Sequence, residues 1–125
     1  MDNEKYFGQF IREKRIAKHI TILEVTSELG ISNPYWCDIE KGRRRPPDLE
    51  KLEKLAKMLE LTYDERSTMM DLAGMYSDQA AEDITGYILT VPGISTALRI
   101  AKDNNVTGEE WQEMIKEMIS RHNLK

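Results

Sequence analysis

Apolar residues recur every three or four positions along most of this 125-residue chain, and no segment shows the strict alternation of a half-buried β-strand. Leu52, Leu55 and Leu59 show this spacing clearly, in a helix predicted over 48–61. The whole pattern predicts eight helices, which begin near residues 5, 21, 32, 48, 62, 84, 94 and 107. We therefore expect an all-α fold.

Polar residues and glycines mark the ends of these helices. A threonine followed three residues later by a glutamate forms a capping-box pattern at 21–24, 62–65 and 107–110. Ser32 can cap the third helix, and Pro34 is tolerated in its first turn because the N–H groups there are unpaired. Gly30 and Gly42 end the second and third helices.

The second and third helices are short and are joined by a turn centred on Gly30. Val25 and Leu29 lie one helical turn apart before the glycine, and Trp36 and Ile39 are spaced similarly after it. Such a pair can pack its inner faces together and place the outer face of the second helix in a DNA major groove. A plain helical hairpin would show the same core pattern.

If Trp36 and Ile39 point inward, the other positions of the third helix face outward. Asn33 can form a two-point contact with adenine, and Asp38 can accept a hydrogen bond from cytosine N4. Tyr35 can bond a phosphate oxygen, and the start of the helix attracts phosphate. The outward residues are Ser32, Asn33, Pro34, Tyr35, Cys37 and Asp38.

A basic loop follows the third helix. It would hold the DNA backbone and provide much of the salt-dependent affinity, although the same arginines could form a merely solvated loop. Its basic residues are Lys41, Arg43, Arg44 and Arg45. Together with the helix starts, the predicted DNA contacts are Thr21, Ser32, Asn33, Pro34, Tyr35, Asp38, Lys41, Arg43, Arg44 and Arg45.

Composition favours a soluble, helix-rich protein in a reducing cytoplasm. Apolar residues make up 40% of the chain and charged residues 32%, and no run of 18 apolar residues predicts a membrane span. The first ten residues lack a signal-peptide pattern, and the lone Cys37 excludes a disulfide framework. We interpret Cys37 as an exposed neutral thiol, with a redox sensor as the alternative.

The net charge of −4 argues only weakly against a nucleic-acid partner, because the positive charge is clustered. Enzymatic chemistry has little support. The two histidines, His19 and His122, are far apart, and the metalloprotease, hydrolase and phosphate-loop motifs are absent. We therefore expect no catalytic activity, no cofactor and no metal.

The run TILEV…LGIS…YWCDIEKGRRRPP, with FIREKR before it and LEKLAKMLEL after it, resembles the Cro and phage-repressor helix-turn-helix family. These are transcriptional regulators of the xenobiotic-response-element type. The resemblance covers roughly residues 6–74 and implies a five-helix DNA-binding domain. The later pattern DLAG…DITGYI…ALRIAKDNN…EEWQEMI is similar to a C-terminal extension in one bacterial branch of this family.

The resemblance also implies a structural ion pair between Arg15 and Glu40. The chain departs from the family pattern at three positions. Ile22 stands where many members carry a phosphate-contacting Gln, and Pro34 replaces an often polar, base-contacting residue. Thr26 stands where a small residue is usual against the recognition helix. These departures affect the reading of bases more than the fold.

We expect two regions, a helix-turn-helix domain over 1–76 and a smaller C-terminal helical region over 77–125, with a boundary near 75–79. The C-terminal helices would form a homodimer, which doubles the contacts with a palindromic site. They could instead pack on the first domain or bind another protein, as in an antitoxin. The favoured function is a sequence-specific repressor that binds double-stranded DNA as a homodimer. Methionines in both regions are interpreted as core filling, with an adaptable binding surface as the alternative.

Overall fold

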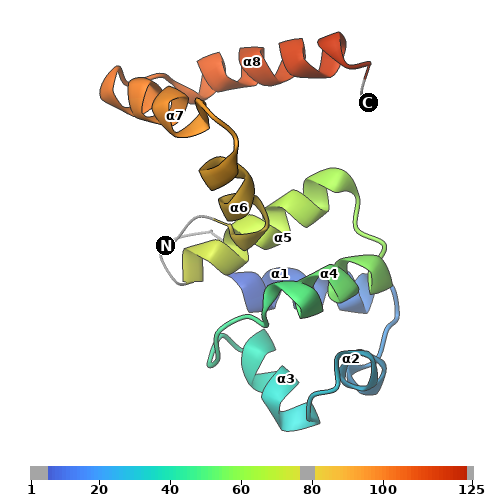
Figure 1. The fold of residues 1–125 in the computed structure, drawn as a ribbon. Coiled ribbons are helices and arrows are strands. Elements are labelled where there is room, and N and C mark those ends of the chain that lie inside the picture. The colour runs from blue at the N-terminus through green and yellow to red at the C-terminus, as the bar shows by residue number, and fades with distance from the viewer. Residues whose placement is uncertain (1–5, 77–80, 124–125) are drawn as a thin grey trace. The chain divides into compact units, whose positions relative to one another are not determined.

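The computed structural model describes residues 6–76 and 81–123, and all regular structure in these ranges is helical. The predicted all-α fold and the eight helices are thereby confirmed for the described chain (Figure 1). The helices are α1 (Phe7–Ala17), α2 (Ile22–Leu29), α3 (Asn33–Glu40), α4 (Leu49–Met58), α5 (Tyr63–Tyr76), α6 (Glu82–Thr90), α7 (Ile94–Asp103) and α8 (Gly108–Arg121).

The chain divides into two compact units, one up to Gly86 and one from Tyr87. The first unit contains α1 to α5 and the beginning of α6. It therefore extends past residue 76, where the sequence pattern placed the end of the first domain. Part of the expected boundary, residues 77–79, lies outside the described residues.

The core of the first unit is made by the inner faces of α1 to α5. Helix α1 packs on α3 and α5, and α2 packs on α3 and α4. The largest fully buried side chains are Trp36, Ile11, Ile39, Leu55, Leu59, Met69, Met70 and Val25. The inward positions predicted for α2 and α3 are thus confirmed. Because α3 is held by α1 behind it and α2 beside it, its outer face has a fixed position.

The helix ends follow the predicted capping patterns. Thr21, Thr62 and Thr107 each accept a hydrogen bond from the backbone N–H three residues later, and the glutamate there accepts one from the threonine N–H. Helix α4 ends at Met58, three residues before the predicted end at 61. The reason is Glu60, whose positive φ of 52° cannot continue a right-handed helix.

The second unit has little core of its own. Ala101 is its only buried residue among those described, and the apolar residues of α7 and α8 keep large exposed fractions. Leu98 is 42% exposed, Ile100 58%, Met114 43% and Met118 55%. Within the described ranges no single helix is long and apolar enough to cross a membrane, and only the bent pair of α6 and α7 taken together reaches that length and composition.

Candidate nucleic-acid interface

The turn between α2 and α3 is built on Gly30. Its φ of 71° is left-handed, and its N–H donates to the carbonyl oxygen of Thr26 at 2.8 Å. After the turn, the Ser32 hydroxyl accepts a hydrogen bond from the Tyr35 N–H at 3.2 Å and caps α3. The two helices are therefore joined by a short connection that these hydrogen bonds hold in place. This is the helix-turn-helix arrangement that the spacing around Gly30 predicted.

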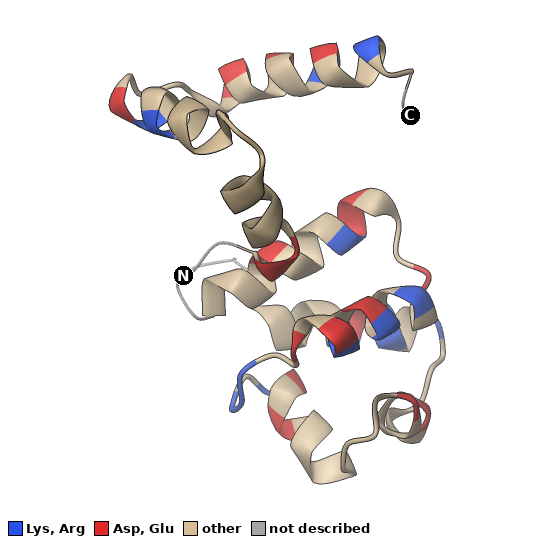
Figure 2. Ribbon diagram, in the orientation of Figure 1, with Lys and Arg blue, Asp and Glu red and all other residues tan. Residues whose placement is uncertain are grey.

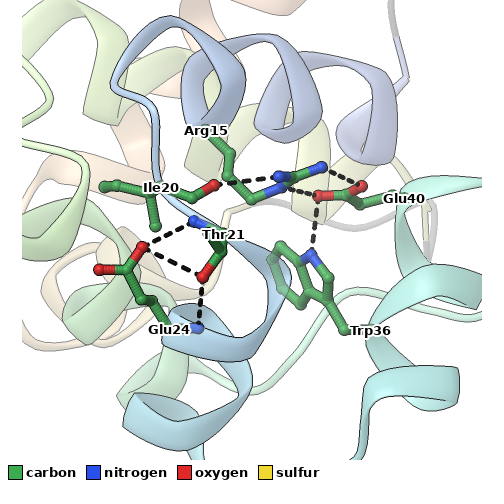
Figure 3. Close-up of polar contacts among 6 residues, drawn as sticks. All are labelled: Arg15, Ile20, Thr21, Glu24, Trp36 and Glu40. Atoms are coloured by element: carbon green, nitrogen blue, oxygen red, sulfur yellow. Dashed lines mark hydrogen bonds and ion pairs between the residues drawn. The ribbon is translucent and has the colours of Figure 1, made fainter.

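A buried polar cluster holds the back of α3 to α1 (Figure 3). The Trp36 indole N–H donates to Glu40 Oε2 at 2.7 Å. The Arg15 guanidinium donates to both carboxylate oxygens of Glu40, at 2.7 and 3.1 Å, and also to the Ile20 carbonyl at 3.0 Å. The structure thus brings together the pair that the family resemblance implied. Arg15 thereby anchors the end of α3 to α1.

Gly8 allows α1 to approach the end of α3 very closely. A Cβ atom at this position would lie 2.2 Å from the Ile39 carbonyl oxygen and 2.6 Å from that of Glu40. The Tyr6 hydroxyl donates to the same Glu40 carbonyl at 3.3 Å. Sequence reasoning did not single out Gly8. A glycine inside a predicted helix is the one local signal that could have indicated a close backbone approach.

The outer face of α3 begins with three exposed residues, Ser32, Asn33 and Pro34. Ser32 is engaged in capping, as expected. Asn33 is not simply free for adenine, because its Oδ1 accepts a hydrogen bond from the Thr26 hydroxyl at 2.8 Å. Thr26 is almost fully buried, so this contact ties the first residue of α3 to the inner side of α2. The sequence pattern had marked Thr26 as unusual without predicting this partner.

Tyr35 and Asp38, further along the outer face, are half-buried, and Arg44 contacts both of them. The Arg44 guanidinium lies 4.6 Å from the centre of the Tyr35 ring and its Nε is 3.9 Å from Asp38 Oδ2. The cationic side chain thereby offsets the carboxylate that would repel phosphate. Pairing with Arg44 leaves Asp38 less available for cytosine than the sequence suggested.

The basic loop starts with a well-formed helix end. Gly42, with a φ of 78°, donates its N–H to the Ile39 carbonyl, and the Arg43 N–H donates to the Asp38 carbonyl. These are the two hydrogen bonds of a Schellman motif. They turn the chain away from α3 and set the start of the loop. The backbone at 41–43 therefore has a defined geometry.

The loop after α3 is rich in lysine and arginine, which Figure 2 marks in blue along its ribbon. Lys41, Arg43, Arg44 and Arg45 are all exposed. Among the described residues, Lys41, Arg43 and Arg45 have no side-chain hydrogen bond or ion pair, so their charges are available to an anion. Of the four, Arg44 is the one that contacts other side chains, those of Tyr35 and Asp38. An exposed cluster of unpaired cations next to the outer face of α3 is well suited to a phosphate backbone.

A groove of about 720 Å³ continues from the loop along α4 and α5. Lys51 lines it together with Arg45 and Tyr35. Lys51 was not among the predicted contacts, because one lysine in a charged helix gives no local signal. Its Nζ lies 3.5 Å from Asp48, which also accepts the Lys51 N–H and caps α4. That backbone hydrogen bond is the main reason why the pKa of Asp48 is lowered.

Thr21 is placed differently from the other predicted DNA contacts. Its N–H and hydroxyl both donate to Glu24 Oε1, at 2.8 and 3.1 Å. These bonds, the backbone one foremost, lower the pKa of Glu24 and keep it ionised. Because the carboxylate already satisfies the start of α2, a phosphate would have to displace it.

No group of three or more metal-ligating side chains occurs among the described residues.

These features define a helix-turn-helix protein, and comparison with known proteins agrees. The sequence model of the family described as "Helix-turn-helix domain" matches residues 7–69, half of the chain. The chain belongs to this family, and the family resemblance drawn from the sequence is confirmed.

Two relatives are named as HTH-type transcriptional regulators. An uncharacterized HTH-type transcriptional regulator of Mycobacterium tuberculosis is 27% identical over 88 residues, which cover 70% of this chain and 60% of that protein. The chain therefore matches less than two thirds of that relative's length. The uncharacterized HTH-type transcriptional regulator RghRB of Bacillus subtilis is 25% identical over 115 residues, with 90% and 83% coverage.

A phage protein and one solved structure are also similar. The ImmF control region 10 kDa protein of Bacillus phage phi105 is 37% identical over 57 residues, covering 46% of this chain and 62% of that protein. A chain of the SinR protein/SinI protein complex matches with a TM-score of 0.46 and 19% identity, over 94% of this chain and 98% of that one.

Proposed function

We propose that this protein is a sequence-specific transcriptional regulator that binds double-stranded DNA as a homodimer and represses from an inverted-repeat operator. The observation that carries the proposal is the rigid α2–α3 pair followed directly by an exposed loop with three unpaired cations, Lys41, Arg43 and Arg45. The family membership and the names of the relatives support the same role. The predicted cytoplasmic location belongs to this proposal.

The mode of DNA binding follows from the positions of these groups. The start of α3, with Asn33 and Pro34 exposed, is the part that can enter the major groove, and Tyr35 can reach its edge. The loop would then lie on the sugar–phosphate backbone, where contacts set the register but do not read sequence. A chain of net charge −4 can bind DNA in this way because its cations are concentrated beside the reading helix.

The homodimer is supported by the second unit. Met114, Ile115 and Met118 form an exposed apolar stripe on α8, and Leu98 adds to the exposed apolar surface of α7. Helices of this length are marginal in water unless an apolar face is covered. Residues 87–125 carry five basic and five acidic residues, so a second copy would meet no net repulsion. A second copy of this chain is therefore a suitable cover.

Repression follows if the dimer occupies promoter DNA and excludes polymerase. The two reading helices of a symmetric dimer would contact half-sites about one helical turn, roughly 10 base pairs, apart or a multiple of that spacing. The other candidate function is a protein-interaction module, such as an antitoxin. It is favoured by the same exposed stripe on α8, because flexible methionines adapt well to a different partner.

The test is selection of bound sequences from a random double-stranded DNA pool at near-physiological salt, with the mass of the complex measured on the enriched DNA. The double variant Arg43→Ala/Arg45→Ala is the matched control, because it removes two loop charges that have no described side-chain partner within the protein. We expect an inverted repeat bound by two chains, with enrichment lost in the control. Absence of enrichment for the unmodified chain would overturn the DNA role and favour a protein partner.

A further inference from the structure

Thr26 connects the inner side of α2 with the first residue of α3. Its side chain is almost fully buried, with 4% exposed, and its hydroxyl donates to Asn33 Oδ1 at 2.8 Å. The hydroxyl also lies 3.1 Å from the Leu23 carbonyl. A hydroxyl has one proton, and the shorter contact is the one to Asn33. The amide of Asn33 is therefore held by a group that cannot itself reach DNA.

This contact decides which atoms of the amide face outward. A two-point contact with adenine needs both amide groups, because the oxygen accepts from N6 and the NH₂ donates to N7. In this structure the Asn33 oxygen is turned toward the buried Thr26. The NH₂ group, which has no hydrogen-bond partner among the described residues, remains for the base edge. Asn33 is thereby presented mainly as a donor.

We infer that Thr26 is a positioning residue that sets the base preference of Asn33, and that the base read there is guanine or thymine in preference to adenine, whose N6 donor would be left without an acceptor beside its N7. Guanine offers O6 and N7 and thymine offers O4 in the major groove. This inference rests on the proposed function, since it applies only if α3 reads DNA. Thr26 would thus influence base preference by orienting the Asn33 amide, although Thr26 itself is buried and does not touch DNA.

The experiment compares base preferences of three chains on the enriched DNA. Thr26→Val removes the hydroxyl with almost the same shape, and Thr26→Ser keeps the hydroxyl and is the matched control. For the unmodified chain and Thr26→Ser we expect guanine or thymine at the position that loses its preference in Asn33→Ala. Thr26→Val should shift this one position toward adenine by about fivefold or more, the lower range for one two-point base contact.

Each outcome has a distinct meaning. A preference of the unmodified chain for adenine or cytosine at that position would show that the amide oxygen faces outward, and would overturn the inference. So would a Thr26→Val chain that binds all sequences more weakly while keeping the same preference, because Thr26 would then only support the fold. Failure of every chain to enrich any sequence would overturn the proposed function, and the inference with it. If the chains enrich DNA but Thr26→Val keeps the base preference of the unmodified chain at this position, the inference is overturned and the proposed function stands.

Discussion

Arg15 on α1 and Glu40 at the end of α3 form a two-point ion pair in which both side chains are nearly buried, with 11% and 6% exposed. Trp36 donates to the same carboxylate from one helical turn earlier. Glu40 thus satisfies three donor groups at once. Because the cluster lies behind the outer face of α3, it couples the stability of the first unit to the position of α3.

Glu40→Ala should lower the free energy of unfolding by about 3–5 kcal/mol, the usual cost of leaving a buried charge without its partner. The measurement is urea denaturation followed by Trp fluorescence. Glu53→Ala is the control, because it breaks the more exposed pair with Arg66 and should cost no more than about 1 kcal/mol. Equal losses in the two variants would contradict a special role for the buried cluster.

Gly8→Ala should force α1 away from α3, because the new Cβ would meet the Ile39 carbonyl at 2.2 Å. Overpacking of this kind costs about 1–3 kcal/mol or more, and backbone atoms cannot rotate aside as a side chain can. Gly86→Ala is the control, since a Cβ there meets nothing within 4 Å and should be neutral or gain about 0.5–1 kcal/mol. Thermal unfolding measures both. A stable Gly8→Ala chain would show that the helices can separate without loss.

Much of the fold was predictable because its signals are local. The spacing of Trp36 and Ile39, the three capping boxes and the glycine of the turn all act within one or two helical turns, and each is present as predicted. The prediction made α4 too long, because the left-handed conformation lies at Glu60 and not at a glycine, which would have marked the helix end in the sequence. Local pattern thus predicts which elements exist better than where they end.

The candidate site was harder to predict, because its contacts cross between elements. The link from Thr26 to Asn33 and the stacking of Arg44 on Tyr35 both depend on how α2, α3 and the loop are oriented in space. Gly8 matters only because α1 meets the end of α3. The residue types predicted which region faces outward. Which atoms in that region remain free to contact DNA depends on the three-dimensional arrangement.

Stability should fall in acid because folding lowers the pKa of two capping glutamates, the exposed Glu24 and the half-buried Glu65. The pKa of Glu24 is lowered chiefly by the Thr21 N–H, and that of Glu65 chiefly by Lys14, from an ordinary value of 4.5. A lowered folded-state pKa gives stability that is fully present above 4.5 and is lost as pH falls through the lower value.

The measurement is the thermal midpoint between pH 7 and pH 3. The double variant Glu24→Gln/Glu65→Gln should have a lower midpoint at pH 7 and a flatter decline toward pH 3. Glu50→Gln is the control, because Glu50 is exposed on α4 and accepts no side-chain hydrogen bond among the described residues. A decline in the double variant as steep as that of the unmodified chain would contradict this assignment.

Arg43→Ala and Arg45→Ala should each weaken binding to all DNA sequences by a similar factor. Both side chains are exposed and unpaired in the described structure, so we expect each to lose about one phosphate contact and to reduce the slope of log K against log salt by about one. Arg121→Ala, which removes a cation at the end of α8, should leave the slope unchanged. A changed base preference instead of a changed slope would place the loop in a groove.

Ile115→Glu should separate the proposed homodimer into single chains. Ile115 lies in the exposed apolar stripe of α8 and is 40% exposed in the single chain, so in a dimer its carboxylate replacement would be buried without a partner. Sedimentation equilibrium gives the mass, and Ser120→Glu, which adds the same charge on the opposite side of α8, is the matched control. We expect one chain for Ile115→Glu and two for Ser120→Glu. If both variants form dimers, the stripe is not part of the dimer interface, and another protein becomes the candidate that covers it.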